Sequence, residues 1–327
     1  MSATIGTLET LVHDEPGIVG ASDAPAVGLA AAVATSPVRR RGAFGGVWRT
    51  TTGKIAIGVL GLVVLLAILG PLLAPYDPNF QNTRKVLAGP SAQHLLGTDY
   101  VGRDVFSRLL AGSTLSVVTA IEAVGIAFVV GVIPGLLSLY LGRPFEWATL
   151  RLMDSLLALP LMIFAIALAA LLGNGLHQAM FAVGILLAPG FYRLTRAAAL
   201  GFIGAQYVTA AELMGASPRW VLAKHVWRKI VPVIVVTTAN AMSLSLLIVA
   251  SLTFLGIGVV PPNPTWGGML ATDLAYLHQR PYGPLFPSLL VMVSVGALNY
   301  IADAISDSAG DAGRARRPPR RPVEATA

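Results

Sequence analysis

The segment AAELMGASPRWVLAKHVWRKIVP, residues Ala210–Pro232, lies between two long apolar stretches of the chain. It carries one glycine, a Ser-Pro pair and five basic side chains if His225 is counted. Turn-forming residues of this kind, Gly and Ser-Pro, punctuate secondary structure rather than continue it. The segment therefore has to be explained as a structure in its own right, and its form decides how the rest of the chain is interpreted.

Helix start and stop signals divide this segment into two short helices. Gln206–Met214 is predicted to be the first, and Gly215 ends it because glycine readily adopts the left-handed conformation past a helix C-terminus. Ser217 then caps a second helix over about Arg219–Lys229, in which proline suits the first position. Pro232 is expected to mark the start of the next apolar span. The pattern predicts a helix–turn–helix lying along a membrane face.

The composition of the whole chain is that of a polytopic membrane protein. Of its 327 residues, 55% are hydrophobic and only 12% are charged, whereas soluble domains are near 25% charged. The chain has no cysteine, which excludes disulfides, thiolate metal sites and cysteine nucleophiles. The net charge is +7, but the basic residues flank apolar stretches instead of forming one stripe, so nucleic-acid binding is rejected.

Six stretches are long enough to cross a bilayer, which takes about 20 apolar residues. Backbone in hydrocarbon must satisfy its own hydrogen bonds, so each is expected to be a helix and the fold to be all-α. The six predicted spans are Ile55–Ala74, Val117–Leu141, Leu152–Leu172, Ala179–Leu200, Val233–Gly258 and Leu285–Ile305.

The distribution of lysine and arginine predicts the orientation of these spans. With the N-terminus inside, 18 of the 23 basic residues fall on inside segments and five on outside segments. Cytoplasmic loops carry this excess, so both termini are predicted to be cytoplasmic in a multi-pass protein of the cell membrane. The loop over about residues 204–231 then faces the cytoplasm, and the Pro75–Gly112 and Val259–Pro284 loops face outside.

The chain divides into three predicted regions. Residues 1–50 are rich in Ala, Gly, Ser and Pro and are expected to be a mostly disordered cytoplasmic tail with a basic end. Residues 51–306 form the six-helix domain. Residues 307–327 are expected to be a basic cytoplasmic tail.

The spans lack the groups that a self-powered transporter uses. Proton- or sodium-driven carriers keep ionisable groups in mid-membrane. Glu122 is the only clear charge in the middle of a predicted span, whereas Asp154 and Asp303 lie near helix ends. No G-x-x-x-x-G-K-[ST] phosphate loop is present, so nucleotide energy has to arrive from another chain. A secondary carrier or channel that uses Glu122 remains the alternative. A membrane enzyme is not supported, because the sequence has no H-E-x-x-H and no clustered carboxylates.

Several segments resemble one known family. The opening segment resembles the EAA loop of permease subunits of ABC importers, of the "C" type in the dipeptide/oligopeptide/nickel group. Three outer segments are also similar to that family: LLAPYDPN at Leu72–Asn79, HLLGTDYVGRDVFSRLLAG at His94–Gly112, and ASLTFLGIGVVPPNPTWGGML at Ala250–Leu270. LNYIADAISD at Leu298–Asp307 resembles the closing helix. The resemblance covers about residues 50–310. The sequence differs from the family at Thr209, where the family usually has Glu, and an acidic residue occurs instead at Glu212.

The resemblance implies a type I (MetI-like) ABC importer transmembrane domain. The chain would pair with a homologous second permease in the lipid bilayer to form the translocation path. One or two ABC ATPase subunits would dock below, and an extracytoplasmic solute-binding protein would deliver solute above. ATP and Mg²⁺ would bind to the ATPase subunits, so this chain itself would carry no cofactor and no catalytic residue. The same permease signatures serve dipeptides, oligopeptides, nickel complexes and opines.

Three groups of site residues follow from these patterns. Small residues, the hinge glycine and one acid are expected to dock the ATPase, or else to form a plain interfacial turn: Ala210, Ala211, Glu212, Gly215, Ala216 and Ser217. Candidates for contact with the binding protein are Asp99, Arg103, Asp104 and Trp266, although a local ion pair between Asp104 and Arg108 would explain the first three equally well. Glu122 is the candidate on the translocation path, or else the partner in a structural hydrogen bond. His94, His177 and His278 lie alone in the sequence, and no metal site is predicted.

Overall fold

The computed structural model describes residues 50–173, 175–203, 205–259 and 261–314. The chain divides into two units, Met1–Arg40 and Arg41–Ala327, and every described residue lies in the second. Most of the predicted N-terminal tail and the last residues of the predicted C-terminal tail lie outside the described residues.

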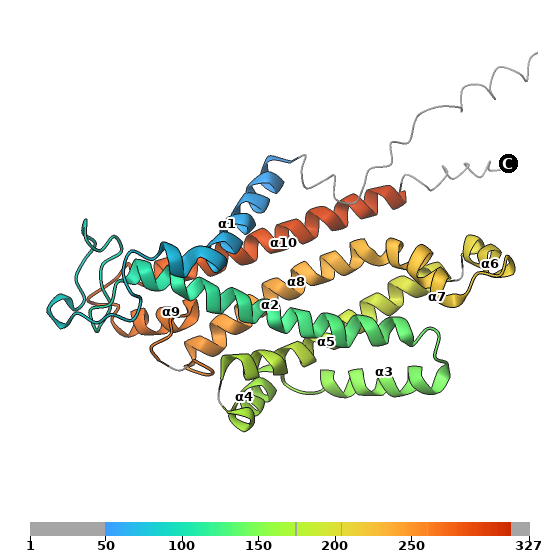
Figure 1. The fold of residues 1–327 in the computed structure, drawn as a ribbon, viewed down its shortest axis with the longest axis horizontal. Helices are drawn as coiled ribbons and strands as arrows, with labels where there is room; N and C mark the ends of the chain where they lie inside the picture. Colours follow the sequence, from blue (N-terminus) through green and yellow to red (C-terminus); the bar gives the residue numbers. More distant parts are fainter. Residues whose placement is uncertain (1–49, 174, 204, 260, 315–327) are drawn as a thin grey trace, which may run out of the picture. The chain divides into compact units, whose positions relative to one another are not determined.

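Within the described ranges the chain is helical and contains no strand (Figure 1). The elements in order are α1 (Thr51–Leu73), the 3-10 turn η1 (Thr83–Lys85), α2 (Val105–Leu137), α3 (Arg143–Leu157), α4 (Leu161–Leu172), α5 (Leu176–Ile203), α6 (Gln206–Leu213), α7 (Pro218–Val221), the π-helical turn η2 (Leu222–Val226), α8 (Trp227–Phe254), α9 (Trp266–Ala275) and α10 (Leu285–Arg314).

Helix α2 begins well before the span that hydropathy predicts. It starts at Val105 rather than Val117, because Asp104 caps it by accepting a hydrogen bond from the Ser107 N–H. The extra turns carry polar residues such as Arg108 and Ser116, which are buried and bonded to neighbouring loops. Hydropathy detects only the apolar remainder of this helix.

The predicted single helix Leu152–Leu172 is wrong. The structure has two helices there, α3 and α4, bent by 94° to each other. Pro160 stands at the N-terminus of α4, and proline both lacks an N–H donor and disfavours helix at the residue before it. Pro134 and Pro189, by contrast, lie inside α2 and α5, whose helices continue through them.

Four helices are long and apolar enough to cross a membrane. They are α1, α2, Lys224–Phe254 and Leu285–Asp307, and the bent pair of α3 and α4 qualifies as a fifth, broken span. Helix α5 covers the predicted span Ala179–Leu200 but is not among them. Polar side chains at both ends, including His177 and Arg196, shorten its apolar stretch. Because α5 is covered by α2, α3, α4 and α8, it needs fewer apolar side chains than a helix that faces lipid.

Helices α2 and α5 form the most extensive packing in the described residues. Two glycines let them approach: a Cβ on Gly131 would lie 2.4 Å from the Ala188 oxygen, and one on Gly184 would lie 2.7 Å from the Ala123 oxygen. Small residues commonly allow such close contacts between membrane helices. Helix α10 packs on the outer side of α8 and α1.

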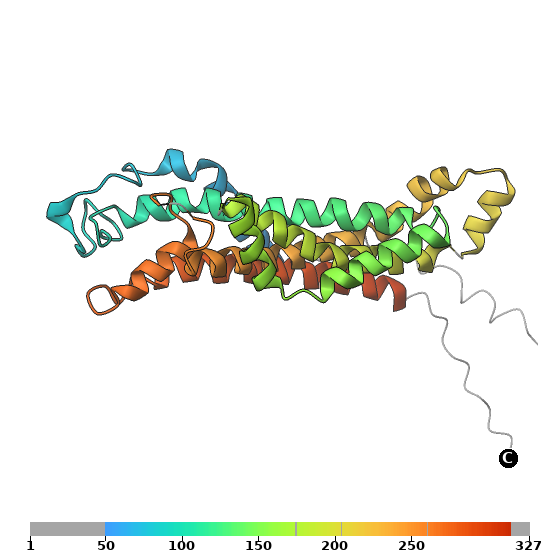
Figure 2. The same ribbon diagram turned by 90° about the horizontal axis from the view of Figure 1, so that it is seen from below.

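Two loop regions lie at opposite ends of the bundle, while α4 and the turns beside it lie between these ends, as Figures 1 and 2 both show. Helices α6 and α7 lie at one end, where α5 turns into α8. The loop containing η1 and helix α9 lie at the other end. The bundle therefore separates two loop regions, each of which contains predicted site residues.

Candidate functional site

The loop between α5 and α8 is a helix–turn–helix, as the sequence predicts. Helix α6 ends at Leu213, and Gly215, two residues beyond it, has φ +87°. The Ala216 N–H donates to the Ala211 oxygen at 3.0 Å and the Met214 N–H to the Ala210 oxygen at 3.1 Å, so the last carbonyls of α6 are satisfied across the glycine.

The second half of this loop differs from the prediction. Ser217 accepts a hydrogen bond from the Trp220 N–H at 3.3 Å, as expected of a cap. However, α7 continues through η2 into α8, and Pro232 lies inside α8 rather than at its start. The π-helical turn explains the continuity, because the Trp227 N–H donates to the Leu222 oxygen five residues before it.

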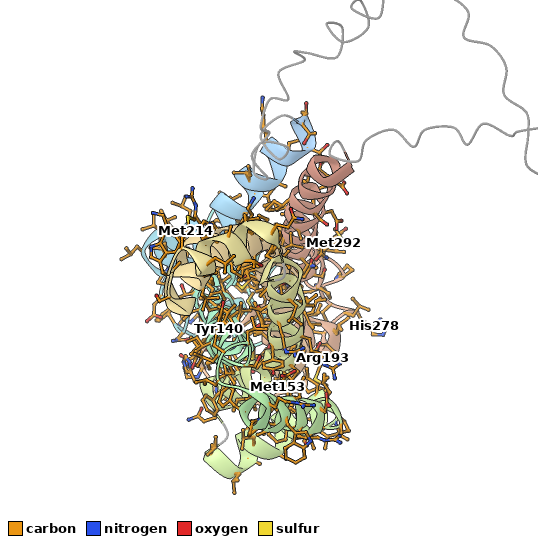
Figure 3. All side chains as sticks on the ribbon, turned by 90° about the vertical axis from the view of Figure 1, so that its right-hand side faces the viewer. Tyr140, Met153, Arg193, Met214, His278 and Met292 are labelled. Atoms are coloured by element: carbon orange, nitrogen blue, oxygen red, sulfur yellow. The ribbon has the colours of Figure 1, made fainter. Side chains whose placement is uncertain are left out.

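The tip of the loop exposes two large apolar side chains. Leu213 is 85% exposed and Met214 is 82% exposed, immediately before the helix-ending glycine. Figure 3 looks along the bundle from this end and labels Met214 on the loop. The sequence argument did not single out these residues. Their signal was two apolar residues just ahead of Gly215, where solvent normally favours polar ones.

The other predicted docking residues divide between the surface and the interior. Ala210, Gly215 and Ser217 are exposed and Ala216 is half-buried, whereas Ala211 is 6% exposed. Glu212 lies in α6, and its side chain is outside the described part of the structure. Any docking surface on this loop is therefore formed by its tip and not by Ala211.

The inner side of the loop joins the core of the bundle. Val208, Val221 and Val226 are almost fully buried and share one cluster with Phe191 of α5 and Ile230 of α8. His225 links the two halves of the loop, with its ring 5.0 Å from that of Trp220 and 6.0 Å from that of Tyr207. The inner side of the loop is thus packed against both α5 and α8.

At the opposite end, a buried charge cluster fixes the loop between α1 and α2. Asp99 accepts hydrogen bonds from the Val101 and Arg103 N–H groups at 3.0 and 2.9 Å and from Arg103 Nε at 2.7 Å. Arg108 Nε lies 3.7 Å from Asp99, and its Nη1 donates to the Pro78 and Pro262 oxygens. The cluster ties residues from three segments together.

The expected ion pair between Asp104 and Arg108 is not present; Arg108 pairs with Asp99 instead. Asp104 accepts from the Ser107 N–H and hydroxyl at 2.8 and 2.7 Å. His94 Nδ1 lies 2.9 Å from Asp104 Oδ1, so His94 does have a partner. The Asp104 carboxylate, which the i,i+4 spacing had paired with Arg108, is instead used to cap the helix.

Trp266 is a buried residue rather than an interfacial one. It is 1% exposed, its N–H donates to the Ser116 hydroxyl at 3.1 Å, and its indole Nε1 donates to the Leu109 oxygen at 3.4 Å. Asp99, Arg103 and Asp104 are also buried. The four predicted outer-contact residues hold the loop in place from inside, and other side chains form its surface.

A second pair extends this cluster to α9. Arg280 Nη1 donates to Asp273 Oδ1 at 3.3 Å and Nη2 to the Leu96 oxygen at 3.0 Å. Burial raises the pKa of Asp273, and the neighbouring Arg280 counteracts this rise. Asp273 Oδ2, buried and without a hydrogen-bond partner among the described residues, borders a cavity of about 20 Å³.

Glu122 of α2 pairs with His177 of α5. His177 Nδ1 lies 2.7 Å from Glu122 Oε2, and the side chains are 58% and 34% exposed. This contact was missed because the two residues are far apart in the sequence. It fits the structural hydrogen bond that was one of the two expectations for Glu122. Among the described residues no group of three His, Asp or Glu could hold a metal.

Three polar contacts join α3 to α5. Glu146 pairs with Arg196, and Asp154 Oδ1 lies 2.5 Å from Arg193 Nη2. Between them Thr149 and Tyr192 share a hydrogen bond of 2.9 Å. Figure 3 labels Met153 and Arg193 on the side where α3 lies against α5.

Comparison with known proteins gives two family matches. Residues 127–309 match the binding-protein-dependent transport system inner membrane component model, and residues 49–90 match the N-terminal TM domain of oligopeptide transport permease C. A chain of the MetNI methionine ABC transporter in an inward-facing conformation has the same fold, with TM-score 0.51 and 18% identity over 62% of this chain and 96% of that chain.

Three relatives are similar over most of their length. They are the di/tripeptide permease DppC of Pseudomonas aeruginosa (37% identical over 76% of this chain and 84% of the relative), the probable D,D-dipeptide permease DdpC of Escherichia coli (36%, over 76% and 84%) and the glutathione permease GsiD of Pectobacterium atrosepticum (35%, over 80% and 88%). Together with a family model that spans more than half of the chain, these matches show that the chain belongs to the binding-protein-dependent transport system inner membrane component family of ABC transporter permeases.

Proposed function

We propose that this chain is a transmembrane permease subunit of an ATP-driven importer for di- or oligopeptides or a related solute. The relatives DppC, DdpC and GsiD are named for di/tripeptides, D,D-dipeptides and glutathione, all of which are peptides. ATP and Mg²⁺ bind to partner ATPase subunits in this proposal, and the chain itself is not an enzyme.

The proposed topology has six spans with both termini in the cytoplasm. It counts α5 and the bent pair of α3 and α4 as spans alongside the four apolar helices. The positive-inside distribution of 18 basic residues against five supports it. The loop between α5 and α8 then faces the cytoplasm, and the buried charge cluster faces the binding protein's side.

A groove of about 810 Å³ between α8, α9 and α10 supports pairing with a second permease. Its lining is almost wholly apolar and includes Phe254 and Met292, which are 40% and 65% exposed. Small residues such as Ala250 and Gly296 also line it, and they allow another helix to approach closely.

The observation that carries the proposal is the exposed tip of the loop between α5 and α8. Leu213 and Met214 stand on a rigid turn whose inner side is part of the core. Large apolar side chains in such positions are typical anchors for a partner's groove. An ATPase that grips this tip can move α5 and α8 together.

The test compares two leucines. Leu213→Asp is expected to weaken co-purification of the ATPase by roughly 30-fold, the loss of about 2 kcal/mol typical of an interface anchor. Leu95→Asp is the matched control, because Leu95 is also exposed, at 57%, but lies in the loop at the other end. Equal ATPase recovery with both variants would contradict docking at the tip.

The alternative, a self-sufficient carrier or channel that uses Glu122, makes the opposite prediction for the isolated chain. Glu122 pairs with His177 at 2.7 Å. A carboxylate and an imidazole in contact are the kind of ionisable groups that proton-driven carriers use. Solute accumulation by the purified chain alone, driven by a proton gradient in vesicles, would favour this alternative and overturn the importer proposal.

A further inference from the structure

One face of α3 carries a basic and aromatic stripe that none of the contacts described above uses. Arg143, Trp147 and Arg151 follow one another at intervals of four residues, so they lie on the same helix face. All three are exposed, Trp147 by 65%. We infer that this stripe binds the phosphate headgroup of an anionic phospholipid.

The charge of the stripe is available for a ligand. The carboxylates of α3, Glu146 and Asp154, are paired with Arg196 and Arg193 of α5. Among the residues that the structure describes, Arg143 and Arg151 have no carboxylate within ion-pairing distance. Two unpaired guanidinium groups on one helix face complement a lipid phosphate in charge, and arginine binds phosphate through two parallel hydrogen bonds.

The geometry of Arg151 directs its charge towards a membrane surface. Its guanidinium carbon lies 6.0 Å from the centre of the Trp147 ring, one turn nearer the N-terminus of α3. Helical side chains lean in that direction, and a basic residue near the end of a membrane helix bends towards the headgroups. Arg151 thereby joins Arg143 near the beginning of the helix.

Trp147 and the residues beyond it suit the rest of a lipid. Tryptophan is enriched at the boundary between headgroups and acyl chains. Further along α3, Leu152 is 56% exposed and Leu157 is 49% exposed. These leucines lie on either side of the stripe, so α3 offers apolar contact to the surrounding acyl chains while the phosphate remains at the two arginines.

The leaflet rests on the proposed function's topology, in which the turn between α2 and α3 is cytoplasmic. The lipid is then an anionic phospholipid of the inner leaflet. Because each basic residue near an anionic surface contributes about 1 kcal/mol, removal of both is expected to weaken lipid binding by roughly 30-fold.

Native mass spectrometry of the full-length chain tests the inference, with phosphatidylglycerol and phosphatidylcholine as probes. The unchanged chain is expected to retain phosphatidylglycerol in preference to phosphatidylcholine, and the double variant R143Q/R151Q is expected to lose that preference. The double variant R84Q/K85Q removes the same charge from the opposite end of the bundle and is expected to behave as the unchanged chain. Thermal unfolding without lipid checks that all three proteins are folded.

Two results would overturn the inference. One is equal phosphatidylglycerol retention by the unchanged chain and by R143Q/R151Q. The other is loss of a co-purifying protein subunit from R143Q/R151Q with lipid retention unchanged, which would make the stripe a protein contact. Neither result depends on the tip of the loop between α5 and α8, so failure here is distinguishable from failure of the importer proposal.

Discussion

Asp99 and Asp77 perform the same local task in two different environments. Each accepts a hydrogen bond from the N–H group two residues further on, at 3.0 Å for Val101 and 2.8 Å for Asn79. Asp77 is exposed, whereas Asp99 is 5% exposed. Only Asp99 also neutralises two buried arginines, Arg103 and Arg108.

This contrast predicts different effects of the same substitution. Asp99→Asn keeps the local turn but leaves Arg103 and Arg108 without their anion, so the free energy of unfolding should fall by about 3 kcal/mol or more. Asp77→Asn should change it by less than about 0.5 kcal/mol. Thermal unfolding of the purified chain in detergent measures both. Similar unfolding midpoints for the two variants would show that the cluster does not hold the loop between α1 and α2.

Single residues were predictable from sequence where the cause is local. The sequence predicted that Gly215 ends the first helix and that Ser217 caps the second. Both depend only on residues within four positions along the chain, and both predictions are confirmed. The partners of Arg108 and Glu122 lie on other segments. Spacing within one helix cannot show such partners, so the predicted pairing of Arg108 was wrong and His177 was overlooked.

The packing of α2 on α5 makes a prediction about two glycines of one helix. A Cβ on Gly131 would lie 2.4 Å from the Ala188 oxygen and 2.5 Å from Phe191 Cβ, whereas a Cβ on Gly125 would meet nothing within 4 Å. Gly131→Ala should therefore lower the free energy of unfolding by about 1–3 kcal/mol, because two helix backbones must move apart. Gly125→Ala should be neutral or slightly stabilising, since alanine favours helix. If both variants unfold at the temperature of the unchanged chain, α2 and α5 do not pack as closely as described.

Helices were predictable where hydrophobicity alone determines them. The predicted span Ile55–Ala74 agrees with α1 within a few residues, since this helix is apolar from Ile55 onwards. The early start of α2 was not predicted, and at Pro160 a kink within one span was expected where the structure has two separate helices. In the first turns of α2, loops distant in the sequence form hydrogen bonds with buried polar groups, which hydropathy does not detect. At Pro160 the residues on both sides are apolar, so hydropathy does not show that the chain bends there.

At the scale of the whole molecule, the cluster that includes Val208 and the cluster that includes Trp266 are separate, and the partly buried Leu187 and Met242 pack against both. The cluster around Val208 and Val221 continues through Phe191 of α5 and Ile230 of α8. Helix α8 in turn packs on α9, whose Asp273 forms a buried pair with Arg280 in the loop that follows the helix. In the proposed function, the turn at the tip is the point at which a partner's force would enter the bundle.

Two glycines with left-handed backbone allow coupling at the loop tip to be tested separately from the effect of backbone strain. Gly215 has φ +87° and Gly173 has φ +116°, and a Cβ at either would meet nothing within 4 Å. Arginine at either position costs about 1–3 kcal/mol of backbone strain, but only Gly215→Arg places a bulky charge beside Leu213 and Met214. Gly215→Arg is expected to abolish peptide uptake while the chain still inserts into the membrane, and Gly173→Arg is expected to leave uptake largely intact. Both are measured by uptake in cells that lack the native permease, with membrane fractionation to confirm insertion; normal uptake by Gly215→Arg would exclude the tip as the point of coupling.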